Sequence, residues 1–193
     1  MKNYFSGTIE EYLENLSGKS AVPGGGSAAA LSAAIGSALN LMVIEFSLKK
    51  GSLPGDDEAL LKRKESDERQ NLQLAKLLID EDCKVFSLLR KAISEKKSER
   101  ESEYIAAAKV PLEICRLACR SLNLAGYLSE NANKNLITDV ECAAHMLRAA
   151  FFSAKVNVEI NLKYIKDEKF SKEVKTELEQ LEQKLKEEYN KFV

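Results

Sequence analysis

The sequence predicts an all-α protein: a single antiparallel helix bundle around a central alanine-rich helix, with one domain over residues 1–193. Two observations predict this class. The chain contains only 3 Pro and 9 Gly among long runs of helix-forming residues, which leaves almost no sequence suited to strands. Residues 28–44 are apolar or small on nearly every side, as in a helix at the centre of a bundle or at a subunit interface.

Capping residues predict the first two helices. Thr8 and Glu11 form a capping box that opens a short helix. A loop over 17–26 follows, and we expect Ser27 to cap the alanine-rich helix, which reaches about Leu48.

Two long helices are predicted in the middle of the chain. A loop over 49–57 ends the alanine-rich helix, and a helix over about 58–97 follows it. A further helical stretch covers 101–128, where Pro111 either kinks the helix or starts a new one. The 58–97 helix carries an apolar stripe that consists of Leu74, Ala75, Leu78, Val85, Phe86, Leu89 and Ile93.

The last part of the chain predicts a polar loop and two helices. The loop covers 129–137, and Thr138 with Glu141 makes a second capping box, which opens a helix to about Ile165. A final amphipathic helix presents apolar residues at helical spacing: Val174, Leu178, Leu181, Leu185 and Tyr189.

Charge and composition exclude several classes of partner. The formal net charge is -1, from 29 Lys+Arg and 30 Asp+Glu, so no broad basic surface is available for nucleic acid or an anionic membrane. The N-terminus lacks the apolar core of a secretory signal, and the 4 Cys form no spaced framework. Residues 28–44 carry polar residues and no basic flank, which indicates a core helix rather than a membrane span. We therefore expect a cytoplasmic protein that binds neither nucleic acid nor membrane.

A metal site is not expected. Cys115 and Cys119 share one helix face, and Cys142 and His145 share another, so the four have the residue types of a zinc site. His145, however, points away from the core stripe of its helix, and buried free cysteines are common.

Asp82 breaks the pattern of its helix. At about 100° per residue it falls at the centre of the apolar stripe, four residues after Leu78 and four before Phe86. Asp80 falls on the opposite, solvated face. A carboxylate in an apolar stripe is either satisfied by a neighbouring helix or has a raised pKa that suits acid–base chemistry.

Two other groups are candidates for binding. The turn Gly24, Gly25, Gly26 and Ser27 leaves amide N–H groups free at a helix start, which suits an anion, although it matches no nucleotide motif. Asn157 and Asn161 lie one turn apart on the edge of a stripe. Their amides either orient a polar ligand or, as we favour from the sequence, bond the backbone of a neighbouring helix.

Taken together, several segments resemble the cyclodeaminase/cyclohydrolase family of folate enzymes. They are Pro23-Gly24-Gly25-Gly26-Ser27-Ala28-Ala29-Ala30-Leu31, Asp80-Glu81-Asp82-Cys83-Lys84-Val85-Phe86, Val110-Pro111-Leu112, Asn133-Lys134-Asn135-Leu136-Ile137-Thr138-Asp139 and Asn157-Val158-Glu159-Ile160-Asn161-Leu162 followed by Asp167. The resemblance implies an all-helical homodimer that takes a reduced folate as substrate and needs no metal or cofactor.

The resemblance also implies roles for residues. A carboxylate in the Asp80/Asp82 segment is tied to catalysis in this family, and the helical phase favours Asp82. The glycine turn and the loop with Asn133 and Lys134 would then hold polar parts of the folate, and Asn157 and Asn161 would orient its ring.

Three functions stay open at the level of the sequence. The first is formiminotetrahydrofolate cyclodeaminase, which forms 5,10-methenyltetrahydrofolate and ammonia. The second is methenyltetrahydrofolate cyclohydrolase, which needs the same groups with water in place of ammonia. The third is a non-catalytic helical binding or scaffold protein, which the short segment 87–110 would favour because it is shorter than usual for the family.

Overall fold

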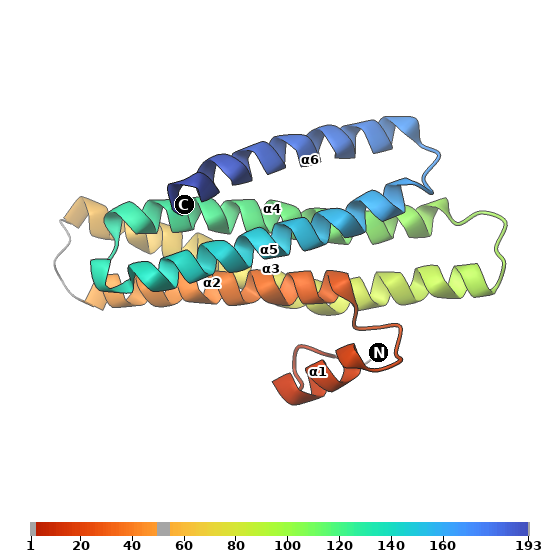
Figure 1. Ribbon diagram of the computed structural model, residues 1–193, viewed down its shortest axis with the longest axis horizontal. Helices are drawn as coiled ribbons and strands as arrows, with labels where there is room; N and C mark the ends of the chain where they lie inside the picture. The colour runs from red at the N-terminus through yellow and green to blue at the C-terminus, as the bar shows by residue number, and fades with distance from the viewer. Residues whose placement is uncertain (1–2, 50–54, 193) are drawn as a thin grey trace.

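The computed structural model describes residues 3–49 and 55–192 (Figure 1). The described residues form only helices and connecting segments, so the predicted all-α class is confirmed. The helices are α1 (Ile9–Ser17), α2 (Gly25–Lys49), α3 (Gly55–Ser94), α4 (Glu101–Asn131), α5 (Ile137–Leu162) and α6 (Glu168–Tyr189), with short 3-10 turns η1 (Lys134–Leu136) and η2 (Asn190–Phe192). Helices α2 to α5 run alongside one another, α6 lies over α4 and α5, and α1 is set apart from the bundle (Figure 1).

The first half of the chain follows the predictions with one error. The capping box of Thr8 and Glu11 is present at the start of α1. The cap predicted at Ser27 is wrong, because α2 already begins at Gly25 and Ser27 lies inside its first turn. Helix α4 runs through Pro111 as a single element. The predicted loop 49–57 falls largely on residues 50–54, which lie outside the described residues.

The second predicted capping box is also wrong. Helix α5 begins at Ile137 after Leu136, and no side chain caps it, so Thr138 lies within the helix. The connection is shorter than predicted, since α4 continues to Asn131 and η1 leads directly into α5. Asn133 caps η1 rather than α5, because its side chain accepts a hydrogen bond from the backbone N–H of Asn135 at 3.1 Å.

Small residues let α2 pack closely at the centre of the bundle. At Gly36 a Cβ atom would overlap the side chain of Leu147 on α5, so the two helices approach each other through that glycine. Helix α2 is long and apolar enough to cross a membrane, but 61% of its most apolar window is buried inside the bundle. Helix α6 packs on the bundle through its predicted apolar face. Val174, Leu178 and Leu185 of this face are buried.

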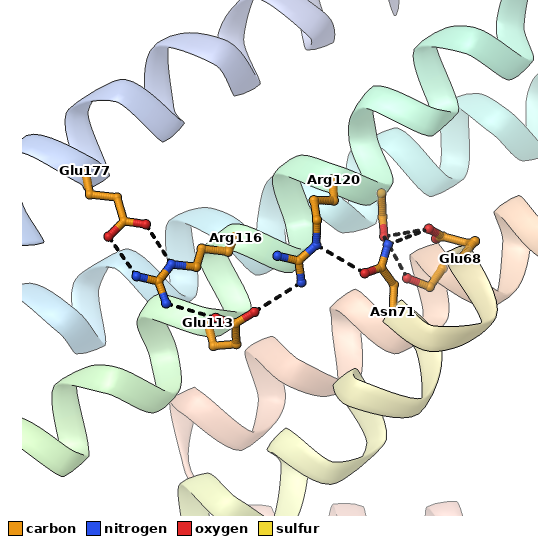
Figure 2. A network of polar contacts seen from close by, with 8 residues as sticks. Glu68, Asn71, Glu113, Arg116, Arg120 and Glu177 are labelled. Atoms are coloured by element: carbon orange, nitrogen blue, oxygen red, sulfur yellow. Dashed lines mark hydrogen bonds and ion pairs between the residues drawn. The ribbon is translucent and has the colours of Figure 1, made fainter. Parts of the chain in front are cut away.

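A polar network crosses the bundle from α6 to its centre. Figure 2 shows Glu177 paired with Arg116, and Glu113 bridging Arg116 to Arg120. Arg120 then donates to Asn71 at 3.2 Å. These contacts join three helices through side chains that are partly or wholly open to water at the α6 end.

The inner end of the network is a buried carboxylate, Glu68, which is only 1% exposed. It accepts hydrogen bonds from Asn40 at 3.2 Å, from Asn71 at 3.0 Å and from Ser121 at 3.0 Å. Burial raises the pKa of Glu68, and these donors oppose the shift. The network therefore ties α2, α3 and α4 together about midway along the bundle.

Candidate functional site

The first turn of α2 meets the carboxylate of Asp82 on α3. A Cβ atom at Gly26 would overlap Asp82 Oδ1, so only glycine lets the carboxylate lie against the helix start. The backbone of the next residue, Ser27, favours the charged form of this carboxylate. Asp82 thus lies at the first turn of α2, where a helix leaves amide groups without a partner.

This position changes the acid–base properties of Asp82. Burial raises its pKa to about 6, while the N–H of Ser27 acts in the opposite direction. A carboxyl group of that pKa exists in both protonation states near neutral pH, which suits a group that must take and return a proton.

Three further polar groups lie beside this carboxylate. The hydroxyl of Tyr12 on α1 is 3.0 Å from Ser27 Oγ, and both side chains are buried. Burial raises the pKa of the neighbouring Cys83 thiol to about 11, while the Ser27 side chain acts in the opposite direction, so the thiol stays protonated at neutral pH. Tyr12 was not singled out from the sequence, because it fits the apolar face of α1. A polar hydroxyl on that apolar face was the feature of the sequence that could have indicated a buried hydrogen bond.

Helix α5 places one of its two predicted amides at the glycine turn. A Cβ atom at Gly25 would lie 3.5 Å from Asn157 Nδ2, so this side chain borders the start of α2. Asn157 donates to the Ser153 carbonyl at 2.8 Å, and Asn161 donates to the Ala107 carbonyl at 3.0 Å. The prediction that both amides bond the backbone of a neighbouring helix is confirmed for Asn161 and wrong for Asn157. Asn161 bonds a neighbouring helix, whereas Asn157 bonds its own.

Asp80 does not lie on a free, solvated face as predicted. It is half-buried, and its Oδ1 accepts a hydrogen bond from the Tyr4 backbone N–H at 2.6 Å. The periodicity of α3 alone does not show that the N-terminal segment contacts this face of the helix. Asp80 therefore anchors the chain that precedes α1.

Asn133 and Lys134 lie at the other end of α2. The Asn133 backbone N–H donates to Ser47 Oγ at 3.0 Å, and Lys134 is exposed. Ser47 is about 30 Å along α2 from Ser27, at a rise of 1.5 Å per residue. Within one chain the structure does not bring this loop to Asp82, so any contribution to that pocket would have to come from a second copy of the chain.

Beyond the start of α2, part of the predicted apolar stripe of α3 is exposed. Phe86 lies one turn after Asp82 on the same stripe of α3 and is 40% exposed, and Ile93 further along is also exposed. Both belong to the predicted apolar stripe, but α2 starts level with Asp82 and does not reach them. Near the same end, Tyr104 and Tyr164 stack with ring centroids 4.8 Å apart. The bundle therefore offers exposed aromatic surface one turn from the carboxylate, at Phe86, and a stacked tyrosine pair on α4 and the residues after α5.

The cysteines and His145 are not gathered into one site. Cys115 donates to the Phe151 carbonyl, and Cys119 donates to the Leu181 carbonyl. His145 Nδ1 instead bonds the Tyr189 hydroxyl at 2.6 Å. Within residues 3–49 and 55–192, no group of three or more His, Cys, Asp and Glu side chains has the geometry to hold a metal ion.

The fold and the site define a class: an all-helical protein whose central helix starts at a glycine turn against a half-buried carboxylate with a raised pKa. The chain belongs to the formiminotransferase-cyclodeaminase family, whose model matches residues 8–180. The resemblance stated from the sequence is thereby confirmed.

Curated relatives carry two names. The chain is 33% identical over 184 residues to the methenyltetrahydrofolate cyclohydrolase of Methylorubrum extorquens, with 90% of this chain and 88% of that one covered. It is 35% identical over 187 residues to the formimidoyltransferase-cyclodeaminase of Gallus gallus, which covers 92% of this chain and 34% of that one. The chain thus spans about a third of the length of the second relative.

A solved structure has the same fold. The crystal structure of formiminotetrahydrofolate cyclodeaminase from Thermotoga maritima superposes with a TM-score of 0.91 at 29% sequence identity. The match covers 97% of this chain and 94% of that chain. The two folds therefore agree over nearly their whole length, although the segment 87–110 is short.

Proposed function

We propose that this chain is a formiminotetrahydrofolate cyclodeaminase in which Asp82 transfers the proton. The observation that carries the proposal is the Asp82 carboxylate, which is held at the start of α2 by Ser27 and has a pKa raised by burial to about 6. The family and the close structural match support this substrate class.

The proposed reaction needs one group that both takes and gives a proton. N10 of the folate attacks the formimino carbon on N5, and the electron pair of the C=N bond moves to its nitrogen. Asp82 takes the N10 proton and passes it to that nitrogen, and a further proton from solvent completes the leaving ammonia. When the C–N bond breaks, the lone pairs of N5 and N10 stabilise the 5,10-methenyl cation, and the ionised carboxylate stabilises its charge.

The surroundings of Asp82 can hold the folate. The N–H groups of Gly24, Gly25 and Gly26 belong to the first turn of α2 and the residue before it, where amides have no partner within the helix. In the proposal they hold a polar edge of the substrate beside Asn157, while the exposed ring of Phe86 takes part of its apolar surface. Gly25 is exposed and open to such a ligand.

The test is the conversion of formiminotetrahydrofolate by the wild type and by Asp82→Asn. Ammonia release and the near-ultraviolet absorbance of the methenyl product are measured together. We expect a loss of 100-fold or more, on the order of the contribution of a general acid–base group. An Asp82→Asn protein that is folded and as active as the wild type would refute the role of Asp82.

A second candidate is methenyltetrahydrofolate cyclohydrolase. It is favoured by the Methylorubrum extorquens relative, since 88% of that protein is covered by the match. Hydrolysis of the methenyl cation uses the same carboxylate with water as the nucleophile. Assaying methenyl hydrolysis beside ammonia release from formiminotetrahydrofolate decides between the two. A non-catalytic scaffold would show neither activity, and the curated relatives all carry enzyme names.

We also propose that the chain works as a homodimer through the outer sides of α2 and α5. Residues 25–44 contain no charged side chain, yet Ile35 within them is 41% exposed. On α5 the neighbouring Met146 is also exposed. An uncharged helix side of this kind is typically covered by another subunit. Light scattering after size exclusion should give a dimer for the wild type and a monomer for Ile35→Glu.

A further inference from the structure

The N-terminal segment is attached to the bundle close to Asp82. Within α1, which is described in full, only Tyr12 is buried, at 6% exposure. Its hydroxyl is hydrogen-bonded to Ser27 Oγ at 3.0 Å. Ser27 directly follows Gly26, where a Cβ atom would lie 2.0 Å from Asp82 Oδ1. Tyr12 is therefore linked to the reacting carboxylate through one residue.

One further contact joins the same segment to α3, and a second closes the segment on itself. The Tyr4 backbone N–H donates to Asp80 at 2.6 Å, and the Tyr4 hydroxyl donates to the Val22 carbonyl at 3.1 Å. The Tyr4 ring also packs edge-on against Tyr12, with centroids 6.5 Å apart. The hydrogen bond between Tyr4 and Val22 thus closes the segment 4–22 into a loop that includes α1. The Tyr12 ring faces the bundle from this loop.

We propose that Tyr12 is a positioning residue of the Asp82 pocket: it docks α1 at the start of α2 and keeps water away from the carboxylate. This role relies on the proposed function only for its catalytic consequence. Its physical basis is the burial of Tyr12 against Ser27, which neither the bundle fold nor the α2 cap requires.

The groups that face this pocket agree with the proposal. The pKa of the Tyr12 phenol is raised first by burial and then by the charges of Cys83, Asp82 and Asp80, while the Ser27 hydrogen bond acts in the opposite direction. On α2, Ser27 faces Asp82, and its N–H favours the charged form of this carboxyl group. Because desolvation is the largest influence on Asp82, removing the covering ring should lower the pKa of this carboxyl group.

The experiment measures the Asp82 pKa in the free protein by carboxyl ¹³C NMR titration, with the signal assigned by its absence in Asp82→Asn. Tyr12→Ala should lower this pKa by about one unit or more, since water enters the pocket. Tyr12→Phe keeps the ring, so the pKa should stay raised. Leu13→Ala is the matched control, because Leu13 neighbours Tyr12 on α1 but is 53% exposed. It should titrate like the wild type.

A second variant keeps the test decisive. If Tyr12→Ala does not fold by circular dichroism, Tyr4→Ala removes the ring that packs on Tyr12 and should give a smaller shift in the same direction. An unchanged Asp82 pKa in a folded Tyr12→Ala or Tyr4→Ala protein overturns the proposal, as does an equal shift in Leu13→Ala.

Kinetics separate this proposal from the proposed function. The acid limb of the kcat/KM profile should move to lower pH in Tyr12→Ala by the same amount as the titration, which a purely structural role would not cause. If the NMR shift occurs but no folate is turned over by the wild type, the positioning role stands and the proposed function is wrong. If the wild type turns over folate but the Asp82 pKa does not shift in Tyr12→Ala, the proposed function stands and the positioning role of Tyr12 is wrong.

Discussion

The carboxylate of Asp82 lies against the α-carbon of Gly26, so close that any side chain at Gly26 would overlap it. This contact joins the middle of α3 to the first turn of α2. It also explains why the turn needs glycine at this position in particular.

Replacing Gly26 by alanine should therefore disturb both the packing and the site. The added Cβ atom would come well under 3.0 Å from Asp82, and α2 or the carboxylate must shift. We expect a loss of about 1–3 kcal/mol in the free energy of unfolding and a strong loss of folate binding. Gly24→Ala is the stability control, since its Cβ atom would meet only the Ala21 carbonyl at 4.0 Å. Urea unfolding of both variants measures the difference, and equal stability would contradict the close contact.

Asp82→Asn should change how stability depends on pH. Burial raises the pKa of Asp82 to about 6 from its ordinary value, so the native state holds this proton more tightly than the unfolded chain. The protonated Asp82 therefore contributes fully to the stability of the native state below about pH 4, and this contribution is lost as pH rises through 6. As pH rises from 4 to 7.5, the free energy of unfolding of the variant should therefore increase by up to about 3 kcal/mol relative to that of the wild type.

Urea titrations at the two pH values give this difference directly. The matched control is Glu81→Gln, because Glu81 is the next residue on α3 but is paired with Lys84 at the surface. Its stability should follow the pH dependence of the wild type. A pH-independent difference between Asp82→Asn and the wild type would show that Asp82 is not desolvated.

Glu68→Ala should destabilise the bundle without touching the Asp82 pocket. The change leaves the donors of Asn40, Asn71 and Ser121 without their buried acceptor and opens a cavity. We expect a cost of about 3 kcal/mol in thermal or urea unfolding. The neighbouring Asp67 is exposed, and Asp67→Ala should stay within about 0.5 kcal/mol of the wild type. Similar effects of the two changes would mean that the network in Figure 2 is not a stabilising element.

Phe86→Ala should weaken folate binding more than stability. The ring lies one turn from Asp82 and is 40% exposed, so its removal leaves no large cavity. An aromatic contact of about 1 kcal/mol corresponds to a roughly five- to tenfold rise in Kd, measured by calorimetry with a reduced folate. Leu88 is also exposed but faces another side of α3, and Leu88→Ala should bind folate normally. Normal binding by Phe86→Ala would exclude this ring from the site.

The sequence by itself determined the helices and the unusual residue within them. Periodicity and composition are local properties, and a helix repeats them every turn, so the all-α class, the α1 capping box and the buried face of α6 were predicted correctly. The phase of α3 was enough to predict Asp82 as the inward carboxylate. The resemblance to the family rested on short segments in the right order and was also correct.

Only the tertiary structure decided what surrounds Asp82. Gly26 and Ser27 are 56 and 55 residues from it in sequence, and Tyr12 arrives from a helix outside the bundle. The caps predicted at Ser27 and Thr138 are wrong because both helices begin earlier: α2 begins at Gly25, and α5 begins at Ile137, directly after the turn η1. Phe86 is exposed because α2 begins level with Asp82. Long-range contacts set burial, and burial sets the pKa of the carboxylate on which the proposed chemistry depends.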